Sequence, residues 1–243
     1  MAGMTFPVRA ITIDLDDTLW PFAPIATRIE QVLEDWMRTH SPITAERFPV
    51  LEMRALRERI FADNPHLIHD LSALRRMAIE QALRDSGADV SLADAAYDEF
   101  YAARNQVTFY PDSLDALARI AARVPVAALT NGNADIARIG LSAHFHSVVH
   151  SREHGAAKPV ASIFHAACRG LDCDPALVLH VGDSIEMDVV GAARAGLRSC
   201  WINRRGDDGT LATWPHADLA PDLEFDTLTG LADWLDAHAD TPH

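Results

Sequence analysis

VRAITIDLDDT, residues 8–18, contains the junction that decides the fold. Residues 8–15 are rich in Val and Ile and predict a buried strand, and this apolar run gives way to Asp14, Asp16 and Asp17 within four residues. Ligands of an open parallel sheet gather at the carboxyl ends of its strands, so these carboxylates are expected to face a crevice. Because like charges repel, a hard divalent cation is their natural counter-ion. The alternative is an ordinary turn, since Asp and Thr are common turn and N-cap residues.

The rest of the chain predicts two kinds of structure in succession. Apolar residues recur at helical spacing from about 22 to 107, with breaks at 41–42, 64–65 and 86–87. Strands and helices then alternate, with strands expected at 125–129, 145–149, 177–181, 199–202 and 217–219 and helices that include 186–195 and 228–237. This pattern predicts an α/β fold, a Rossmann-like parallel sheet with helices on both faces, plus an inserted all-helical cap. We place the core at residues 1–19 and 110–243 and the cap at residues 20–109.

Composition narrows the class of protein. A net charge of -14 argues against nucleic acid as a partner, because binding its backbone requires concentrated Lys and Arg. No run of about 20 apolar residues occurs, which argues against a membrane partner. Three cysteines without a C-x-x-C pair indicate free thiols in a reducing compartment. We therefore expect a cytoplasmic protein, a monomer or a homodimer.

Polar residues follow each of the main predicted strands. Thr130 and Asn131 end the second, Lys158 lies in the turn after the third, and Asp183 and Asp188 follow the fourth. Carboxylates, a hydroxyl and an ammonium group at one edge of a sheet suit phosphoryl transfer, which requires a nucleophile and a cation clamp on the phosphoryl oxygens. Taken singly, Thr130 fits a turn and Lys158 a solvated surface position; their ordered occurrence at strand ends favours one shared site.

Together these motifs resemble those of the haloacid dehalogenase-like hydrolase superfamily, in the branch with a helical cap after the first strand. The resemblance covers about the whole chain. It implies that Asp14 is the nucleophile, that Asp16 is the general acid and base, and that Thr130, Asn131 and Lys158 bind the phosphoryl group. It also implies Mg²⁺ as cofactor, with metal ligands from Asp14, the carbonyl of Asp16 and Asp183. The same resemblance implies a metal role for Asp188, either directly, through water or through the lysine.

Asp16 favours one reaction of this superfamily over the others. A carboxyl group two residues after the nucleophile can protonate a leaving alkoxide and then activate water, as a phosphate ester requires. We therefore expect a phosphatase that forms an aspartyl-phosphate. A phosphomutase and a 2-haloacid dehalogenase are the less favoured alternatives, and a phosphoaspartate signalling module without turnover is the alternative from another class.

The substrate is expected to be a small phosphorylated metabolite. The stretches around Asp14, 68–70, 130–134, 179–183 and 200–202 resemble the bacterial phosphatases that act on FMN and 5-amino-6-(5-phosphoribitylamino)uracil. We expect Trp20 to stack on the substrate ring and Arg75 to meet its polar groups, with packing and solvent exposure as their alternatives. Phosphoglycolate, a nucleotide or a sugar phosphate are the alternative substrates.

Four histidines between 144 and 154 suggest a zinc site as a further alternative. They are His144, His146, His150 and His154. No nearby cysteine completes a tetrahedral set, and the oxygen-rich Mg²⁺ site already accounts for the expected chemistry. The sequence therefore favours the aspartates as the metal site.

Overall fold

Parallel strands form a single six-stranded sheet in the order β3-β2-β1-β4-β5-β6 in this computed structural model, which describes residues 6–206 and 208–238. Its strands are β1 (Ala10–Ile13), β2 (Val126–Thr130), β3 (Ser147–His150), β4 (Val178–Gly182), β5 (Arg198–Ile202) and β6 (Leu223–Phe225). The first strand is central, between β2 and β4. The chain therefore brings the residues after β1, β2 and β4 to the same edge of the sheet.

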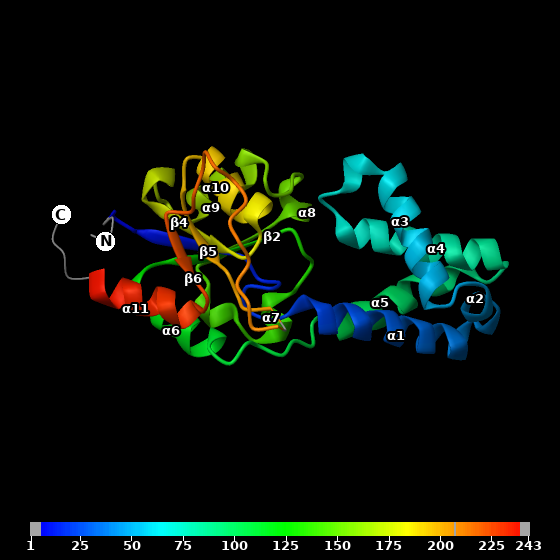
Figure 1. Cartoon of the computed structure of the whole chain (residues 1–243). Helices are drawn as coiled ribbons and strands as arrows, with labels where there is room; N and C mark the ends of the chain where they lie inside the picture. The colour runs from blue at the N-terminus through cyan, green and yellow to red at the C-terminus, as the bar shows by residue number, and fades with distance from the viewer. Residues whose placement is uncertain (1–5, 207, 239–243) are drawn as a thin grey trace. The chain divides into compact units, whose positions relative to one another are not determined.

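Helices cover both faces of this sheet, which confirms the predicted class of fold (Figure 1). In that view α9 (Ala161–Gly170) and α10 (Gly191–Arg194) lie above the sheet, and α6 (Ser113–Arg123) and α11 (Leu228–His238) lie below it. Every residue of β1, β2 and β4 is buried, because both sides of these strands are packed. One core cluster joins Ala127 and Leu129 of β2 to Phe164 of α9.

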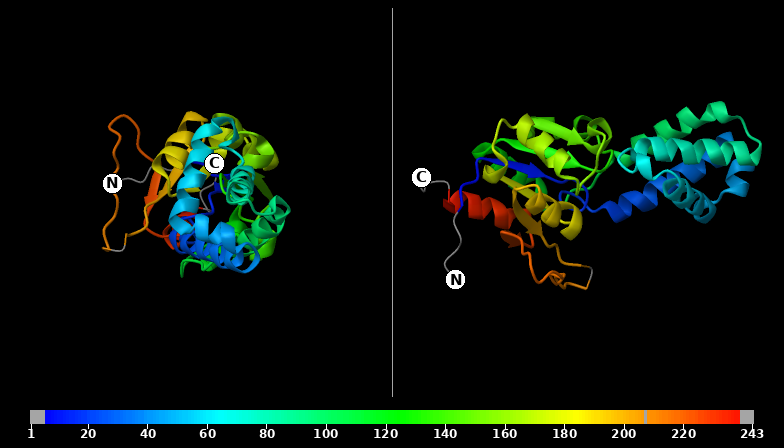
Figure 2. Two further views of the ribbon diagram at one scale, coloured as in Figure 1. Left: turned by 90° about the vertical axis from the view of Figure 1, so that its right-hand side faces the viewer. Right: turned by 90° about the horizontal axis from the view of Figure 1, so that it is seen from above.

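Most of the remaining helices form a second compact unit. The segment Phe22–Val107 and residues 133–139 belong to this unit. Its helices are α1 (Phe22–His40), α2 (Pro42–Arg47), α3 (Val50–Asp63), α4 (Leu71–Ser86), α5 (Ala93–Arg104) and α7 (Ile136–Ile139), with 3₁₀ turns at Pro65–Leu67 and Val90–Leu92. Figure 2 shows α1 to α5 gathered into one bundle. Ile25, Ile29 and Leu33 bury one face of α1, at the spacing that the sequence shows.

One local prediction, that of the last strand, is wrong. The last strand is Leu223–Phe225 rather than residues 217–219, because the Asp222 carboxylate accepts hydrogen bonds from the Ser199 backbone and the Arg198 side chain and holds this segment against β5. The helix expected at 186–195 is present, and it begins as a π-helical turn, Ile185–Val190, that continues into α10. Short helices at Ser151–His154 (α8), Ser142–His144 and Pro175–Leu177 were not predicted.

No helix among the described residues combines the length and apolarity that a membrane crossing requires.

Candidate active site

Asp14 lies immediately beyond the carboxyl end of β1, at the centre of the sheet edge. Its backbone N–H donates to the Val181 carbonyl at 2.9 Å, so the ladder between β1 and β4 continues to this residue. Asp14 is 8% exposed. The chain then turns sharply at Asp17, whose φ of 59° is in the left-handed region and whose N–H donates to the Trp20 carbonyl at 2.8 Å. This geometry holds the Asp14 carboxylate at the edge of the sheet formed by the carboxyl ends of the strands.

Lys158 is a buried cation between two carboxylates. Its Nζ atom lies 2.6 Å from Asp14 Oδ1 and 2.6 Å from Asp188 Oδ1. Asn131 fixes the lysine backbone from both sides, because its Oδ1 accepts from the Lys158 N–H at 2.7 Å and its Nδ2 donates to the Lys158 carbonyl at 3.0 Å. The predicted contact of Asn131 with substrate stays a prediction, while its observed contacts position the lysine.

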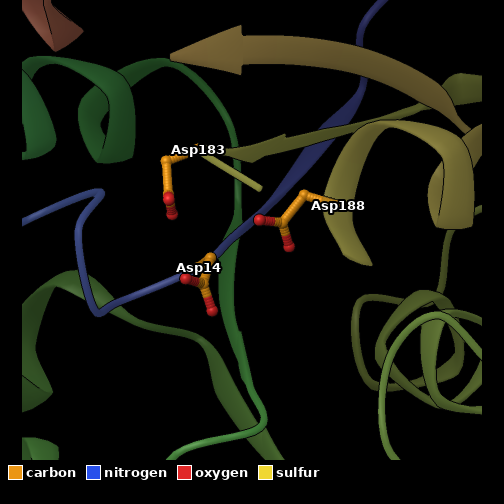
Figure 3. A group of neighbouring side chains, drawn as sticks. All are labelled: Asp14, Asp183 and Asp188. Carbon is orange, nitrogen blue, oxygen red and sulfur yellow. The ribbon is translucent and has the colours of Figure 1, made fainter. Parts of the chain in front are cut away.

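Asp183 and Asp188 approach the same point from β4 and the π-helical turn (Figure 3). Asp183 Oδ1 accepts from the Thr18 hydroxyl at 3.2 Å, and its backbone carbonyl accepts from the Trp201 indole at 2.8 Å. Asp188 Oδ2 accepts from the Ser184 N–H at 3.0 Å. A Cβ atom at Gly182 would lie 2.3 Å from Asp188 Cγ. Only glycine therefore fits at position 182 beside this carboxylate.

Electrostatics leave the site short of positive charge. Burial raises the pKa of Asp14 well above its usual range, against the opposing effect of Lys158. Burial, together with Asp188 and Asp17, raises the pKa of Asp183 to about 7. Burial also disfavours the Asp188 carboxylate, but Lys158 and the His180 hydrogen bond outweigh it and lower the pKa of Asp188. One ammonium group thus faces three carboxylates, which is the charge pattern of a cation site.

The residues present fit a hard divalent ion. Asp14, Asp183 and Asp188 each offer a carboxylate oxygen, and these three oxygens lie within 4.8 Å of one another. In the parts of the chain that the structure describes, this is the one group of three or more acidic, His or Cys side chains with such spacing. The histidine segment forms no comparable group there: His150 instead pairs with Glu153, and His154 contacts the Ser162 hydroxyl. The predicted carbonyl ligand from Asp16 stays a prediction.

Thr130 ends β2 and is buried. Its hydroxyl accepts a hydrogen bond from the Gly132 N–H at 2.9 Å, which closes the turn after the strand. The turn-forming alternative considered for Thr130 is therefore present in the structure. Its predicted contact with a phosphoryl group stays a prediction.

Trp20 and Arg75, the residues predicted to meet the substrate body, have protein partners. Trp20 has no exposed surface; its indole N–H donates to Asp16 Oδ1 at 2.8 Å and its ring packs on Phe109. In this placement the Trp20 indole orients the Asp16 carboxyl group. Arg75 belongs to the helical unit, where its guanidinium lies 4.5 Å from the centre of the Phe100 ring. Burial and the charge of Arg57 lower the pKa of Arg75 to about 10. Substrate binding by either residue stays a prediction.

Sequence reasoning missed residues that support the site from behind. His180 is 1% exposed, and its ring lies between the Thr12 hydroxyl and the Asp188 carboxylate. Burial lowers the pKa of the His180 ring, although Asp188 acts against this effect. A histidine inside an otherwise apolar strand was the available signal, because a buried ring with two nitrogen atoms requires polar partners.

Comparison with known proteins agrees with this geometry. A family model described as haloacid dehalogenase-like hydrolase matches residues 8–196. The 5-amino-6-(5-phospho-D-ribitylamino)uracil phosphatase YigB of Escherichia coli (strain K12) is 32% identical, over 92% of this chain and 94% of its own. The glyceraldehyde 3-phosphate phosphatase of Methanopyrus kandleri is 29% identical, over 93% and 96% of the two chains.

A solved structure is similar across nearly the full length. It is that of a protein named 2-haloacid dehalogenase from Pseudomonas syringae pv. Tomato DC3000, and it matches with a TM-score of 0.86 and 34% identity over 95% of this chain and 99% of that one. The predicted family and fold are thus confirmed, and relatives named as phosphatases support the predicted class of enzyme. The chain belongs to the haloacid dehalogenase-like hydrolase family.

Proposed function

We propose that this enzyme is a Mg²⁺-dependent phosphomonoester hydrolase that works through an aspartyl-phosphate on Asp14. The observation that carries the proposal is the placement of Lys158, whose Nζ lies 2.6 Å from both Asp14 and Asp188. A nucleophilic carboxylate beside a fixed cation can approach an anionic phosphoryl group, which a bare cluster of carboxylates would repel.

The reaction has two chemical steps, in which Asp14 is the nucleophile and Asp16 is first the acid and then the base. An oxygen of Asp14 attacks phosphorus, and the departing alkoxide takes a proton from Asp16. Asp16 then accepts a proton from the water that attacks phosphorus, which releases phosphate and restores the Asp14 carboxylate. The Trp20 indole, 2.8 Å from Asp16 Oδ1, holds that carboxyl group in place between the steps. Mg²⁺ bound by Asp14, Asp183 and Asp188 would supply charge neutralisation for the phosphoryl oxygens.

Because the similar solved structure is that of a protein named 2-haloacid dehalogenase, dehalogenation is the second candidate function. Asp16 favours phosphate esters, because a halide leaves without a proton whereas an alkoxide requires one. The discriminating assay supplies an aryl phosphate or 2-chloropropionate to the same enzyme preparation with Mg²⁺. Sustained phosphate release without chloride release supports the proposal, and chloride release alone would replace it with dehalogenation. A stoichiometric burst of phosphorylation without turnover would indicate a signalling module.

For the substrate we propose FMN or 5-amino-6-(5-phosphoribitylamino)uracil. The likeness to YigB supports the second compound, since that relative is named for it. Space for a substrate body lies next to the acidic cluster: a hollow of about 480 Å³ is lined by residues that include Asp183, Tyr110 and Trp201. Tyr110 is half-buried, and its aromatic ring suits contact with a planar ring system.

A panel of phosphorylated metabolites, ranked by kcat/KM, tests this assignment. It includes FMN, the phosphoribitylaminouracil, phosphoglycolate, a nucleoside monophosphate and glyceraldehyde 3-phosphate. We expect the two ribityl phosphates to rank first. A tenfold preference for phosphoglycolate or the nucleotide would overturn the substrate and leave the phosphatase chemistry intact.

A further inference from the structure

His180 lies in the middle of β4, beneath the catalytic edge of the sheet. The register of the parallel strands sets Thr12 of β1 directly beside it. His180 is 1% exposed, and the Phe164 ring of α9 packs at a right angle to the imidazole with a centroid distance of 5.0 Å. These contacts fix the plane of the imidazole and leave its two nitrogens to meet partners on opposite sides.

Those partners define which nitrogen donates. Nε2 lies 3.0 Å from Asp188 Oδ1, and Nδ1 lies 2.8 Å from the Thr12 hydroxyl. A carboxylate accepts and has no hydrogen to give, so the hydrogen of this contact belongs to His180 Nε2 whatever the charge of the ring. In the neutral ring Nδ1 is then an acceptor, and the Thr12 hydroxyl donates to it.

Asp188 is 1% exposed, and its Oδ1 accepts from two donors. Lys158 Nζ is 2.6 Å away and His180 Nε2 is 3.0 Å away, while Oδ2 takes the Ser184 N–H. Removal of the histidine donor would leave part of a buried carboxylate unsatisfied, and the carboxylate would turn or draw the lysine closer. Because Lys158 is shared equally between Asp188 and Asp14, any such shift changes its distance to Asp14.

We propose that His180 is a positioning residue, which through its Nε2 hydrogen bond fixes Asp188 and so centres Lys158 between Asp188 and Asp14. The chain of contacts runs from Thr12 through His180, Asp188 and Lys158 to Asp14, and every member lies in the sheet-containing unit. His180 itself touches neither substrate nor reacting atoms in this scheme.

Substitution of His180 by Gln or by Asn distinguishes the roles of the two ring nitrogens, because the two amide side chains differ in length. In His180→Gln the amide nitrogen can reach the place of Nε2 and keep the donor to Asp188. In His180→Asn it reaches only the place of Nδ1, and His180→Phe keeps the ring shape without either nitrogen. We expect kcat to fall about 10- to 100-fold in the Phe and Asn variants and to stay within about threefold of the parent in the Gln variant, as for partners that orient metal-site residues.

His165→Gln is the matched control, because His165 Nε2 also makes one hydrogen bond, at 2.8 Å to the Ala195 carbonyl, away from the acidic cluster. Its kcat should equal that of the parent. Rescue of kcat by Gln but not by Phe or Asn supports the proposal. Equal kcat in the Gln and Phe variants, whether high or low, would overturn it.

This kinetic readout rests on the proposed function, so a second measurement tests the inference without turnover. The ring-nitrogen NMR spectrum of the ¹⁵N-labelled, metal-free parent is compared with that of His180→Gln, which identifies the His180 signals by their loss. We expect hydrogen on Nε2, and a shift of the Nδ1 signal in Thr12→Val. A ring with hydrogen on Nδ1 alone would overturn the inference, whereas absence of phosphatase activity with the expected spectrum would overturn only the proposed function.

Discussion

Asp183→Asn is expected to stabilise the metal-free protein at alkaline pH. Burial, Asp188 and Asp17 raise the pKa of Asp183 to about 7, from an ordinary value of 3.8. Between these two values the folded protein binds a proton that the unfolded chain releases, so this group makes the stability fall as pH rises through that window. Asparagine has the shape of the carboxyl group and removes the charge.

The size of the effect follows from the two pKa values. A difference of about three pH units, at about 1.4 kcal/mol each, sets an upper limit of about 4 kcal/mol at about pH 8. Asp183 is partly exposed, and solvent screens the repulsion. We therefore expect the variant to gain about 1 to 2 kcal/mol at about pH 8, and this gain to shrink as the pH falls from about 7 to about 4, below which it is absent.

Urea unfolding in EDTA measures this difference, with Asp98→Asn, on the exposed side of α5, as the control for loss of a carboxylate. Excess Mg²⁺ should reverse the order, because an ion at about 100 times its Kd stabilises the parent by about 2.7 kcal/mol and the variant by less. A variant that is less stable than the parent in EDTA at pH 8 would refute the charge repulsion. An order unchanged by Mg²⁺ would refute Asp183 as a metal ligand.

Three further predictions concern single groups of the site. Asp16→Asn should slow alkyl phosphates more than aryl phosphates, because a poorer leaving group depends more on the acid; equal losses in kcat would argue against that role. Gly182→Ala should lower kcat at least about tenfold and stability by about 1 to 3 kcal/mol, since the added Cβ would lie 2.3 Å from Asp188 Cγ; normal kinetics would show that the carboxylate moves freely. EDTA should abolish turnover and Mg²⁺ restore it, and full activity of the metal-free enzyme would exclude the metal role.

The sequence predicted those parts of the site that follow strands. An apolar run that ends in carboxylates indicates the carboxyl end of a strand, and the alternation of strands with helices brings several such ends to one edge. Asp14, Asp183 and Asp188 meet there, as their positions in the pattern indicated. The same reasoning could place Lys158 only in a turn. Its contacts with Asp14 and Asp188 depend on the conformation of that turn, which the sequence pattern does not determine.

The supporting residues could not be found in this way. The contact between Thr12 and His180 depends on the register of β1 against β4, which periodicity does not determine. From the sequence, Trp20 was equally compatible with stacking on a ligand and with packing inside the protein. In the structure its indole N–H donates a buried hydrogen bond to Asp16. The segment after β5 is long and polar, so the short strand at Leu223–Phe225 gave little signal before its pairing was known.

Acid quenching of the enzyme during turnover of a ³²P-labelled aryl phosphate tests the central claim most directly. The aryl ester makes the result independent of the physiological substrate. Peptide mapping should locate the label on Asp14, and Asp14→Asn, which keeps the fold but lacks a nucleophilic carboxylate, should carry no label and show no turnover. Label on another residue, or sustained turnover by folded Asp14→Asn, would contradict the assignment of Asp14 as the nucleophile.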